Sequence, residues 1–350
     1  MSDLFQLSRI LSLAALAFAV AFALTPLWVH FLIKYRLGKQ IRAEGAPVFN
    51  QMHQKKAGTP TMGGLLIWLT VLILALLFWV LTKFGVDNFI GKLNFLNRSQ
   101  TLLPLGALVA SALVGLADDL LGIFHVGPKG GGLKMRHRLL IYTAIASFGA
   151  WWFFVKLDWS VVHIPFIGNF DIGWWYIPIF IFILVATAFS VNETDGLDGL
   201  AGGTLMTAFG AYGVIAYAQG HYDLAAFCGV ILGALLAFLW FNINPAKFFM
   251  GDTGAMSLGI TLGIIAMLTN HFLLLPLICF IMVAESASVL IQIISKKLRH
   301  GKKVFISAPI HHHLEAKGWP ESQITMRFWI ISFIAAAIGL IIAFLDRFYL

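Results

Sequence analysis

Residues 102–122, LLPLGALVASALVGLADDLLG, decide the fold class of this chain. A helix of about 20 apolar residues is long enough to cross the hydrocarbon core of a membrane. The charged side chains of this stretch, Asp118 and Asp119, both come near its end. The stretch therefore predicts a membrane-spanning helix that carries two carboxylates at one end.

Similar apolar runs recur along the whole chain of 350 residues, which is 59% hydrophobic and only 11% charged. Soluble domains are about 25% charged, so a soluble enzyme is excluded, and two cysteines give no disulfide framework. Continuous apolar runs also exclude an outer-membrane barrel, because the strands of such a barrel alternate apolar and polar residues. We predict an all-α polytopic membrane protein, a single domain over 1–350, with about ten transmembrane helices at 11–33, 62–82, 102–122, 138–156, 175–191, 200–218, 223–243, 253–270, 272–295 and 327–346.

Basic residues predict how this bundle is oriented. Lys34, Arg36, Lys39 and Arg42 follow the first run, whereas Arg9 alone precedes it. Loops rich in Lys and Arg stay in the cytoplasm, so the first loop is predicted to be cytoplasmic. With ten spans, both termini are extracytoplasmic. The predicted cytoplasmic segments then hold 18 of the 24 Lys and Arg residues; these segments are 34–60, 123–138, 192–199, 244–252 and 296–327.

Unusual polar residues gather at the predicted cytoplasmic helix ends. Besides Asp118 and Asp119, they lie in SVNETDGLDGL at 190–200, FNINPAKFFMGDTG at 241–254 and HHHLEAKGWPE at 311–321. Carboxylate oxygens suit Mg²⁺, which proteins bind through one or two carboxylates plus substrate phosphates. When two carboxylates lie close together, their repulsion raises the pKa of one of them. An Asp with such a raised pKa can act as a general base. The pattern predicts an active site for phosphate chemistry at the cytoplasmic face.

Each motif also has a structural interpretation, which the residues alone leave open. Asp118 and Asp119 could mark a helix end in water, and Asp195 and Asp252 could be ordinary N-caps. The three histidines could lie in a solvated loop. Adjacent side chains on a helix point about 100° apart, so all three cannot ligate one zinc ion, and phosphate contact is favoured. Glu285, inside the ninth run, is interpreted as a helix-packing acid.

Together these motifs resemble the phospho-N-acetylmuramoyl-pentapeptide transferase family, within the polyprenyl-phosphate hexosamine-1-phosphate transferases. The resemblance covers nearly the whole chain, from Lys56 to the tenth span. It includes GTPTMGG at 58–64, the paired aspartates, the 192–198 and 249–252 segments and PIHHHLE at 309–315. The triple His followed by KGWPE at 317–321 resembles the muramoyl-pentapeptide branch in particular. Phe189 and Glu193 depart from the family pattern, in which Asn and Leu are frequent.

The resemblance implies a reaction. Members transfer phospho-N-acetylmuramoyl-pentapeptide from UDP-N-acetylmuramoyl-pentapeptide to undecaprenyl phosphate, with Mg²⁺, giving lipid I and UMP. This step of peptidoglycan biosynthesis, needed for cell-wall biogenesis, cell shape and cell division, takes place in the bacterial cytoplasmic (inner) membrane. The expected partners are both substrates and the lipid bilayer, without nucleic acid. A homodimer is left open, and direct attack by the lipid phosphate is favoured over a covalent phospho-enzyme.

The resemblance also implies residue roles. Asp118 would act as base with Asp119 beside it, and the full implied catalytic set is Asp118, Asp119, Asp252, His311, His312 and His313. Mg²⁺ would be held by Asp252, Asp195 and Asn192. Phe249 would stack on the uracil, and the implied substrate-binding set is Lys56, Thr61, Lys134, Asn192, Asp195, Asp198, Asn242 and Phe249.

Two rival functions stay open. A polyprenyl-phosphate N-acetylglucosamine-1-phosphate transferase of the same superfamily would carry a different His motif and lack Gly-Trp-Pro-Glu. An ion-coupled transporter would place its ionisable groups near the membrane midplane, in broken helices of paired repeats. In this chain the acids lie at predicted helix ends and no repeat is visible.

Overall fold

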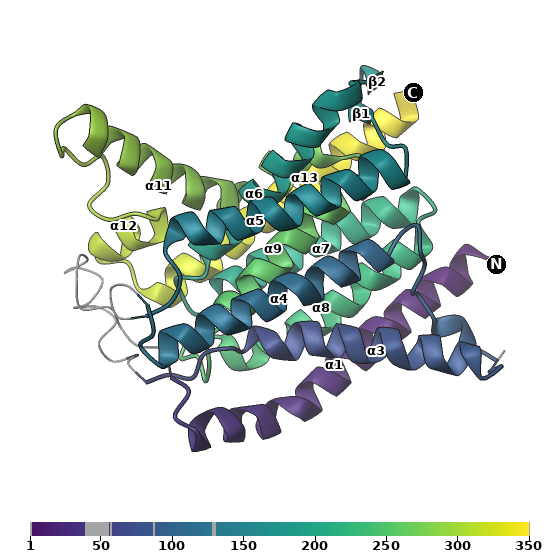
Figure 1. Ribbon diagram of the computed structural model, residues 1–350, viewed down its shortest axis with the longest axis horizontal. Coiled ribbons are helices and arrows are strands. Elements are labelled where there is room, and N and C mark those ends of the chain that lie inside the picture. The colour runs from purple at the N-terminus through teal and green to yellow at the C-terminus, as the bar shows by residue number, and fades with distance from the viewer. Residues whose placement is uncertain (1, 39–55, 57, 87, 128–130, 350) are drawn as a thin grey trace.

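The computed structural model describes residues 2–38, 56, 58–86, 88–127 and 131–349 (Figure 1). Within that part of the chain, nine helices are long and apolar enough to cross a membrane, and one bent helix pair makes up to ten. The prediction of a helical protein with about ten helices of membrane-spanning length is confirmed. The nine unbroken candidate spans are α1 (Asp3–Lys34), α3 (Gly64–Lys83), α4 (Leu102–Ile123), α5 with its π-helical extension η4 (Met135–Trp151, Trp152–Lys156), η5 with α6 (Gly173–Trp175, Tyr176–Thr194), α7 (Leu200–Ala218), α8 (Tyr222–Asn242), α9 (Gly251–Leu268) and α13 (Glu321–Tyr349).

The bent pair replaces the single ninth span predicted at 272–295. A short 3-10 turn, η6 (Phe272–Leu274), leads into α10 (Leu275–Ile278), and α11 (Phe280–Leu298) follows at an angle of 85°. The break falls at Cys279, three residues after Pro276, the proline of the first turn of α10, and the predicted continuous span did not allow for it. Figure 1 shows α11 leaving the helical bundle and exposing one of its ends.

Two further elements lie outside the spans. Strands β1 (Val161–Ile164) and β2 (Gly168–Asp171) form an antiparallel hairpin in which His163 faces Asn169. This hairpin was not among the elements predicted from the sequence, because each strand has only four residues. The short helix α12 (Ile310–Ala316) carries the three histidines, and η2 (Gly91–Leu93) is a single turn.

Helix α9 is the centre of the bundle. Its span is 94% buried, and it packs against α3, α4, α6 and α7. Small residues allow this close packing, as is common between membrane helices. A Cβ atom added at Gly115 of α4 would lie 2.3 Å from the carbonyl oxygen of Asp252, so a glycine is required there. The end of α4 is thereby held against the first turn of α9.

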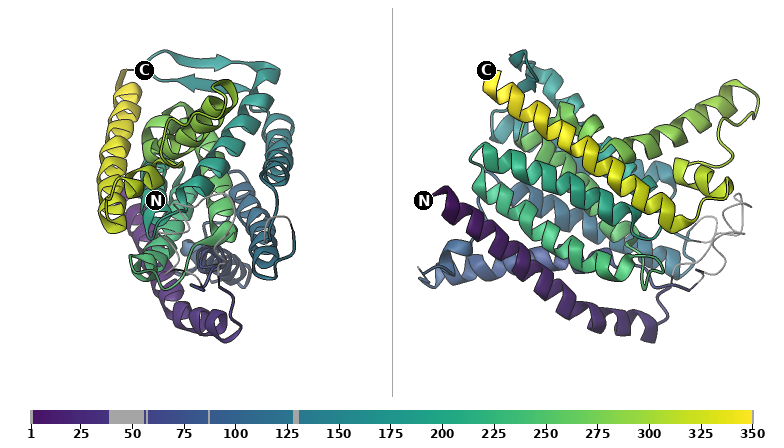
Figure 2. Two further views of the ribbon diagram at one scale, coloured as in Figure 1. Left: turned by 90° about the vertical axis from the view of Figure 1, so that its left-hand side faces the viewer. Right: turned by 180° about the vertical axis from the view of Figure 1, so that it is seen from behind.

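Both chain termini and the hairpin lie at one end of the bundle, and α12 lies at the other (Figures 1 and 2). This arrangement agrees with an even number of spans. The assignment of the α12 end to the cytoplasm remains a prediction from the Lys and Arg distribution. Among those basic residues, Lys39, Arg42, Lys55 and Lys129 lie outside the described residues.

Candidate active site

The acidic ends of α4 and α9 meet through Asp119. Its Oδ1 accepts the backbone N–H of Asp252, and its Oδ2 accepts that of Thr253, both at 3.0 Å. The first N–H groups of a helix lack partners within the helix, so Asp119 caps α9 from a neighbouring helix. The resemblance placed Asp119 beside the base, whereas the structure gives its carboxylate a positioning role.

The turn before Asp252 depends on Gly251. Its φ of 76° lies in the left-handed region that side chains with a Cβ rarely adopt. A Cβ there would also lie 2.6 Å from Asp119 Oδ2 and 2.8 Å from Thr61 Oγ1. The predicted substrate residue Thr61 is therefore packed, buried, against this turn.

Arg138 joins the two remaining acids. Its Nη2 lies 2.7 Å from Asp118 Oδ2 and 2.8 Å from Asp252 Oδ2. The Asn192 amide donates to Asp252 Oδ1 at 2.7 Å, and Leu133 N–H donates to Asp118 Oδ1 at 2.6 Å. Because buried charges are costly without partners, the guanidinium stabilises the acid pair. Arg138 was not among the predicted site residues, although its place at a predicted cytoplasmic helix start was a signal.

These side chains fit a divalent cation chemically. Asp118 and Asp252 bring carboxylate oxygens to Arg138 Nη2, and the amide oxygen of Asn192 lies 3.3 Å from Nη1 of the same guanidinium. Carboxylate and amide oxygens are ligands that Mg²⁺ accepts. A positive group already lies between the two carboxylates. Asp195, the third predicted metal ligand, ends α6 as its C-cap, three residues after Asn192. Lys134 is the N-cap of α5, with an exposed side chain, one helical turn before Arg138.

A second cluster forms around Lys56. Its Nζ lies 2.7 Å from Asp198 Oδ1, pairs with Glu321 and sits 5.8 Å from the ring centroid of Phe249. Glu321 also accepts the backbone N–H of Asp198 at 2.7 Å. The structure thus brings three predicted residues together and adds Glu321. The Gly-Trp-Pro-Glu motif was noted in the sequence, but no role was assigned to its acid.

Asn242 hydrogen-bonds to the backbone of the two loops that carry Asp198 and Phe249 of this second cluster. Its Oδ1 accepts Gly199 N–H at 3.0 Å, and its Nδ2 donates to the Phe248 carbonyl at 2.8 Å. The side chain is only 4% exposed. The resemblance implied that Asn242 lines a uridine pocket, whereas these bonds tie together the loops before α7 and α9.

The three histidines of α12 contact three different partners. Nδ1 of His312 lies 2.6 Å from Glu315, and Nδ1 of His313 accepts the Ile306 N–H at 3.1 Å. Nδ1 of His311 lies 2.9 Å from Oε2 of Glu285. The divergence agrees with the expectation that the triplet cannot surround one ion.

His311 connects α12 to the Asp195–Asp198 loop. It is fully buried, and a Cβ at Gly196 would lie 2.1 Å from its Nε2. Burial alone would lower the pKa of His311, but the carboxylates of Glu285, Glu315 and Glu193 raise it above the ordinary value of 6.5. Glu285, interpreted from sequence as a packing acid, therefore also positions a site histidine.

Comparison with known proteins identifies the class of protein. Residues 101–270, from the start of α4 to the end of α9, match the model of glycosyl transferase family 4. Membrane-length helices, this match and the acidic, basic and histidine side chains at one end define a multi-pass membrane phosphosugar transferase.

The particular family follows from two further matches. Residues 56–67 match phospho-N-acetylmuramoyl-pentapeptide-transferase signature 1. The chain is 40% identical to the phospho-N-acetylmuramoyl-pentapeptide-transferase of Chloroflexus aggregans, over 97% of this chain and 90% of the relative. It is also 40% identical to that of Geobacillus thermodenitrificans, over 94% of this chain and 96% of the relative. The chain belongs to the phospho-N-acetylmuramoyl-pentapeptide-transferase family, which confirms the resemblance found from its motifs.

Proposed function

We propose that this protein transfers phospho-N-acetylmuramoyl-pentapeptide from UDP-N-acetylmuramoyl-pentapeptide to undecaprenyl phosphate, at the cytoplasmic face of a bacterial inner membrane. The products are lipid I and UMP. The observation that carries the proposal is the joining of Asp118 and Asp252 by Arg138, at the same bundle end as α12. Two anionic substrates repel each other, so their reaction needs cationic groups that neutralise their charge and acids held in a fixed orientation.

The proposed chemistry is a direct phosphoryl transfer. An oxygen of the lipid phosphate forms a bond to the β-phosphorus of the UDP-sugar, the bond from that phosphorus to the bridging oxygen breaks, and UMP leaves with that oxygen. Such a reaction needs positioning and charge neutralisation more than covalent help. Asp118, oriented by Leu133 N–H and Arg138, would accept a proton still carried by the lipid phosphate.

Mg²⁺ would be held by Asp252 and Asn192, with Asp195 as the further predicted ligand. When bound, it would neutralise charge on the diphosphate. Arg138 would add a fixed positive charge beside the same phosphates, because its guanidinium already contacts both acids. His311, His312 and His313 would contact the sugar–phosphate part of the substrate.

The nucleotide is proposed to bind at the second cluster. The ring of Phe249 would stack on uracil, while Lys56, held by Asp198 and Glu321, would lie beside it. Asn242 would keep the two loops together. Thr61 and Lys134 would extend the contacts toward the phosphates.

The prenyl chain is proposed to lie along α11. This helix leaves the bundle next to α12 and exposes a row of large apolar side chains, which are Leu290, Ile291, Ile293, Ile294 and Leu298. Apolar surface of this kind is stable in contact with lipid but not with water. The lipid phosphate would thereby be delivered to the end that carries the acids.

Release of UMP by the purified protein tests the proposal. With Mg²⁺, UMP should appear from UDP-N-acetylmuramoyl-pentapeptide only when undecaprenyl phosphate is added. Equal use of UDP-N-acetylglucosamine would favour the rival transferase, and no release would refute the reaction. Omission of Mg²⁺ with added chelator should abolish release, and unchanged turnover would refute the metal requirement.

A further inference from the structure

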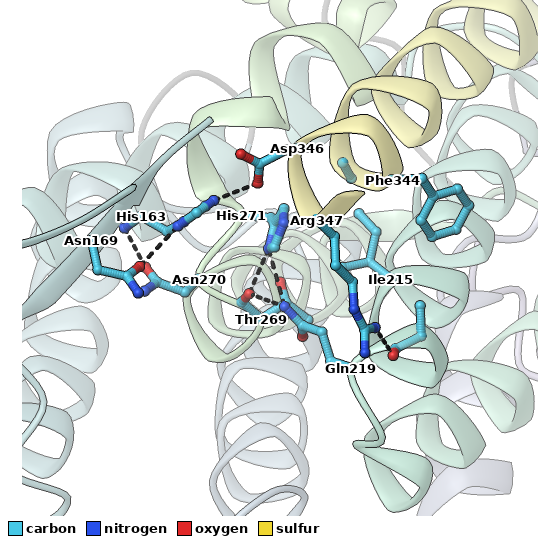
Figure 3. Close-up of a pocket in the computed structure, with 12 residues that line it drawn as sticks. His163, Asn169, Ile215, Gln219, Thr269, Asn270, His271, Phe344, Asp346 and Arg347 are labelled. Atoms are coloured by element: carbon cyan, nitrogen blue, oxygen red, sulfur yellow. Dashed lines mark hydrogen bonds and ion pairs between the residues drawn. The ribbon is translucent and has the colours of Figure 1, made fainter. Parts of the chain in front are cut away.

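A second group of polar side chains lies at the opposite end of the bundle, where the hairpin and both termini are found. His163 comes from β1, His271 from the turn between α9 and η6, and Asp346 from α13. Each offers one ligand atom, and these three atoms lie within 4.8 Å of one another. In Figure 3 the His163 ring points at Asp346, and the His271 ring lies beside them.

The remaining polar atoms of these side chains are held by neighbours. Nδ1 of His271 lies 2.7 Å from the Thr269 carbonyl oxygen, which can only accept, so this nitrogen carries a proton and Nε2 keeps its lone pair. The Gln219 amide also lies 3.2 Å from this nitrogen, but it donates to the same carbonyl at the shorter distance of 2.8 Å. The free nitrogen of His271 is the one that a metal would use.

His163 and Asp346 are oriented in the same manner. Nδ1 of His163 lies 2.8 Å from Asn169 Oδ1, which leaves Nε2 facing Asp346 Oδ2 at 2.5 Å. The other carboxylate oxygen of Asp346 accepts the Phe166 N–H at 2.6 Å. Hydrogen bonds to the outer atoms of metal ligands fix ring orientation in known metal sites.

We propose that His163, His271 and Asp346 bind one divalent transition metal, with zinc the best match to two imidazoles and one carboxylate. Proteins bind zinc through such nitrogen and oxygen donors, and sites with three protein ligands keep a further position for water. The group borders a cavity of about 420 Å³, which is open to such a water. Arg347 also lines the cavity, and its guanidinium donates a hydrogen bond to the Ala218 carbonyl oxygen.

The metal would connect three segments that are distant in sequence. The hairpin, the α9–η6 turn and the last turns of α13 would share one ion, which would replace the proton between His163 and Asp346. The alternative is a hydrogen-bonded cluster without metal, in which that proton stays in place. The metal site and the metal-free cluster make different predictions, because only the metal site loses bound zinc when one of these three side chains is replaced.

Metal content decides between them. Purified full-length protein is treated with chelator, exchanged into buffer with ZnCl₂, freed of excess zinc and measured by mass spectrometry. His163→Gln, His271→Gln and Asp346→Asn should each retain one zinc equivalent less than the wild type. His30→Gln, which changes an exposed histidine of α1, should retain the wild-type amount. The difference between variants separates this site from any zinc held by His311, His312 or His313.

A thermal readout guards against misfolded variants. Asp346→Asn preserves the shape of the side chain, and UMP release from UDP-N-acetylmuramoyl-pentapeptide shows whether that variant is folded. Zinc should raise the unfolding midpoint of the wild type and of His30→Gln, but not that of Asp346→Asn. Equal zinc content in the wild type and all three site variants, or equal zinc-induced midpoint shifts, would overturn the proposal.

Discussion

The carboxylate of Asp119 accepts the backbone N–H of Asp252 at 3.0 Å, so one acid of the α4 pair holds the helix turn that presents the acid of α9. The neighbouring Asp118 instead contacts Arg138. Two adjacent aspartates with the same sequence context therefore have different structural roles. This difference leads to the first two predictions.

Asp119→Asn should weaken the fold as well as the reaction. An amide has one accepting oxygen, so one of the N–H groups of Asp252 and Thr253 would face an NH₂ group. Leaving a buried donor unpaired costs about 1–3 kcal/mol. We expect a lower unfolding midpoint at fixed scan rate and reduced UMP release. An unchanged midpoint would contradict the positioning role.

Asp118→Asn and Asp252→Asn should each abolish most of the activity while the protein stays folded. Removing a proton-transfer group typically lowers the rate about 10²–10⁴-fold, and we expect the loss of a proposed metal ligand to fall in the same range. The matched control is Asp158→Asn, at an exposed position near the hairpin. Initial rates of UMP release measure the effect, and wild-type rates in either site variant would refute the assignment.

Phe249→Leu should raise the KM for the UDP-sugar more than it lowers kcat. A base stacked on an aromatic ring gains about 1–3 kcal/mol, which is a change of roughly 5-fold or more in KM. Phe124→Leu, at the exposed C-cap of α4, is the control for loss of an aromatic ring at the same bundle end. A KM equal to that of the wild type would show that the ring does not contact the nucleotide.

The His311–Glu285 pair should make stability depend on pH. The folded-state pKa of His311 is raised above 6.5 by Glu285, Glu315 and Glu193, so its stabilising contribution is complete below pH 6.5 and is lost as the pH rises through the raised value. We expect the unfolding midpoint of the wild type to exceed that of Glu285→Gln most at acidic pH. A difference that stays constant from below pH 6.5 to well above it, into the alkaline range, would contradict this interpretation.

Several features of the fold and site were predictable because they depend on local composition. Apolar runs of membrane length predicted nearly all spans, since no other structure satisfies the backbone in lipid. Acids in such runs are costly, at about 2.5–3.5 kcal/mol for an Asp at a helix centre. Acids retained in such runs therefore indicated a functional site, and the motifs that contain these acids identified the family.

Other features depend on residues that are distant in sequence. Pro276 lies in the predicted ninth span, but it does not by itself give the 85° bend three residues later, at Cys279. The hairpin strands are too short to give a pattern. Arg138 and Glu321 could not be assigned to the site from sequence, because their partners come from distant segments of the chain. These partners are the carboxylates beside Arg138 and the lysine beside Glu321. Pairwise distances of this kind have no counterpart in hydropathy or spacing.

By itself, the sequence determined the class of protein, the approximate number of spans and which residue types carry the chemistry, because burial in lipid and the cost of charge act on each segment separately. Only the tertiary structure decided which acid faces Arg138 and which acid caps α9. It also decided that His163, His271 and Asp346, spread over more than half of the chain, lie within reach of one ion. Those assignments depend on how helices pack, and packing is a property of all segments together.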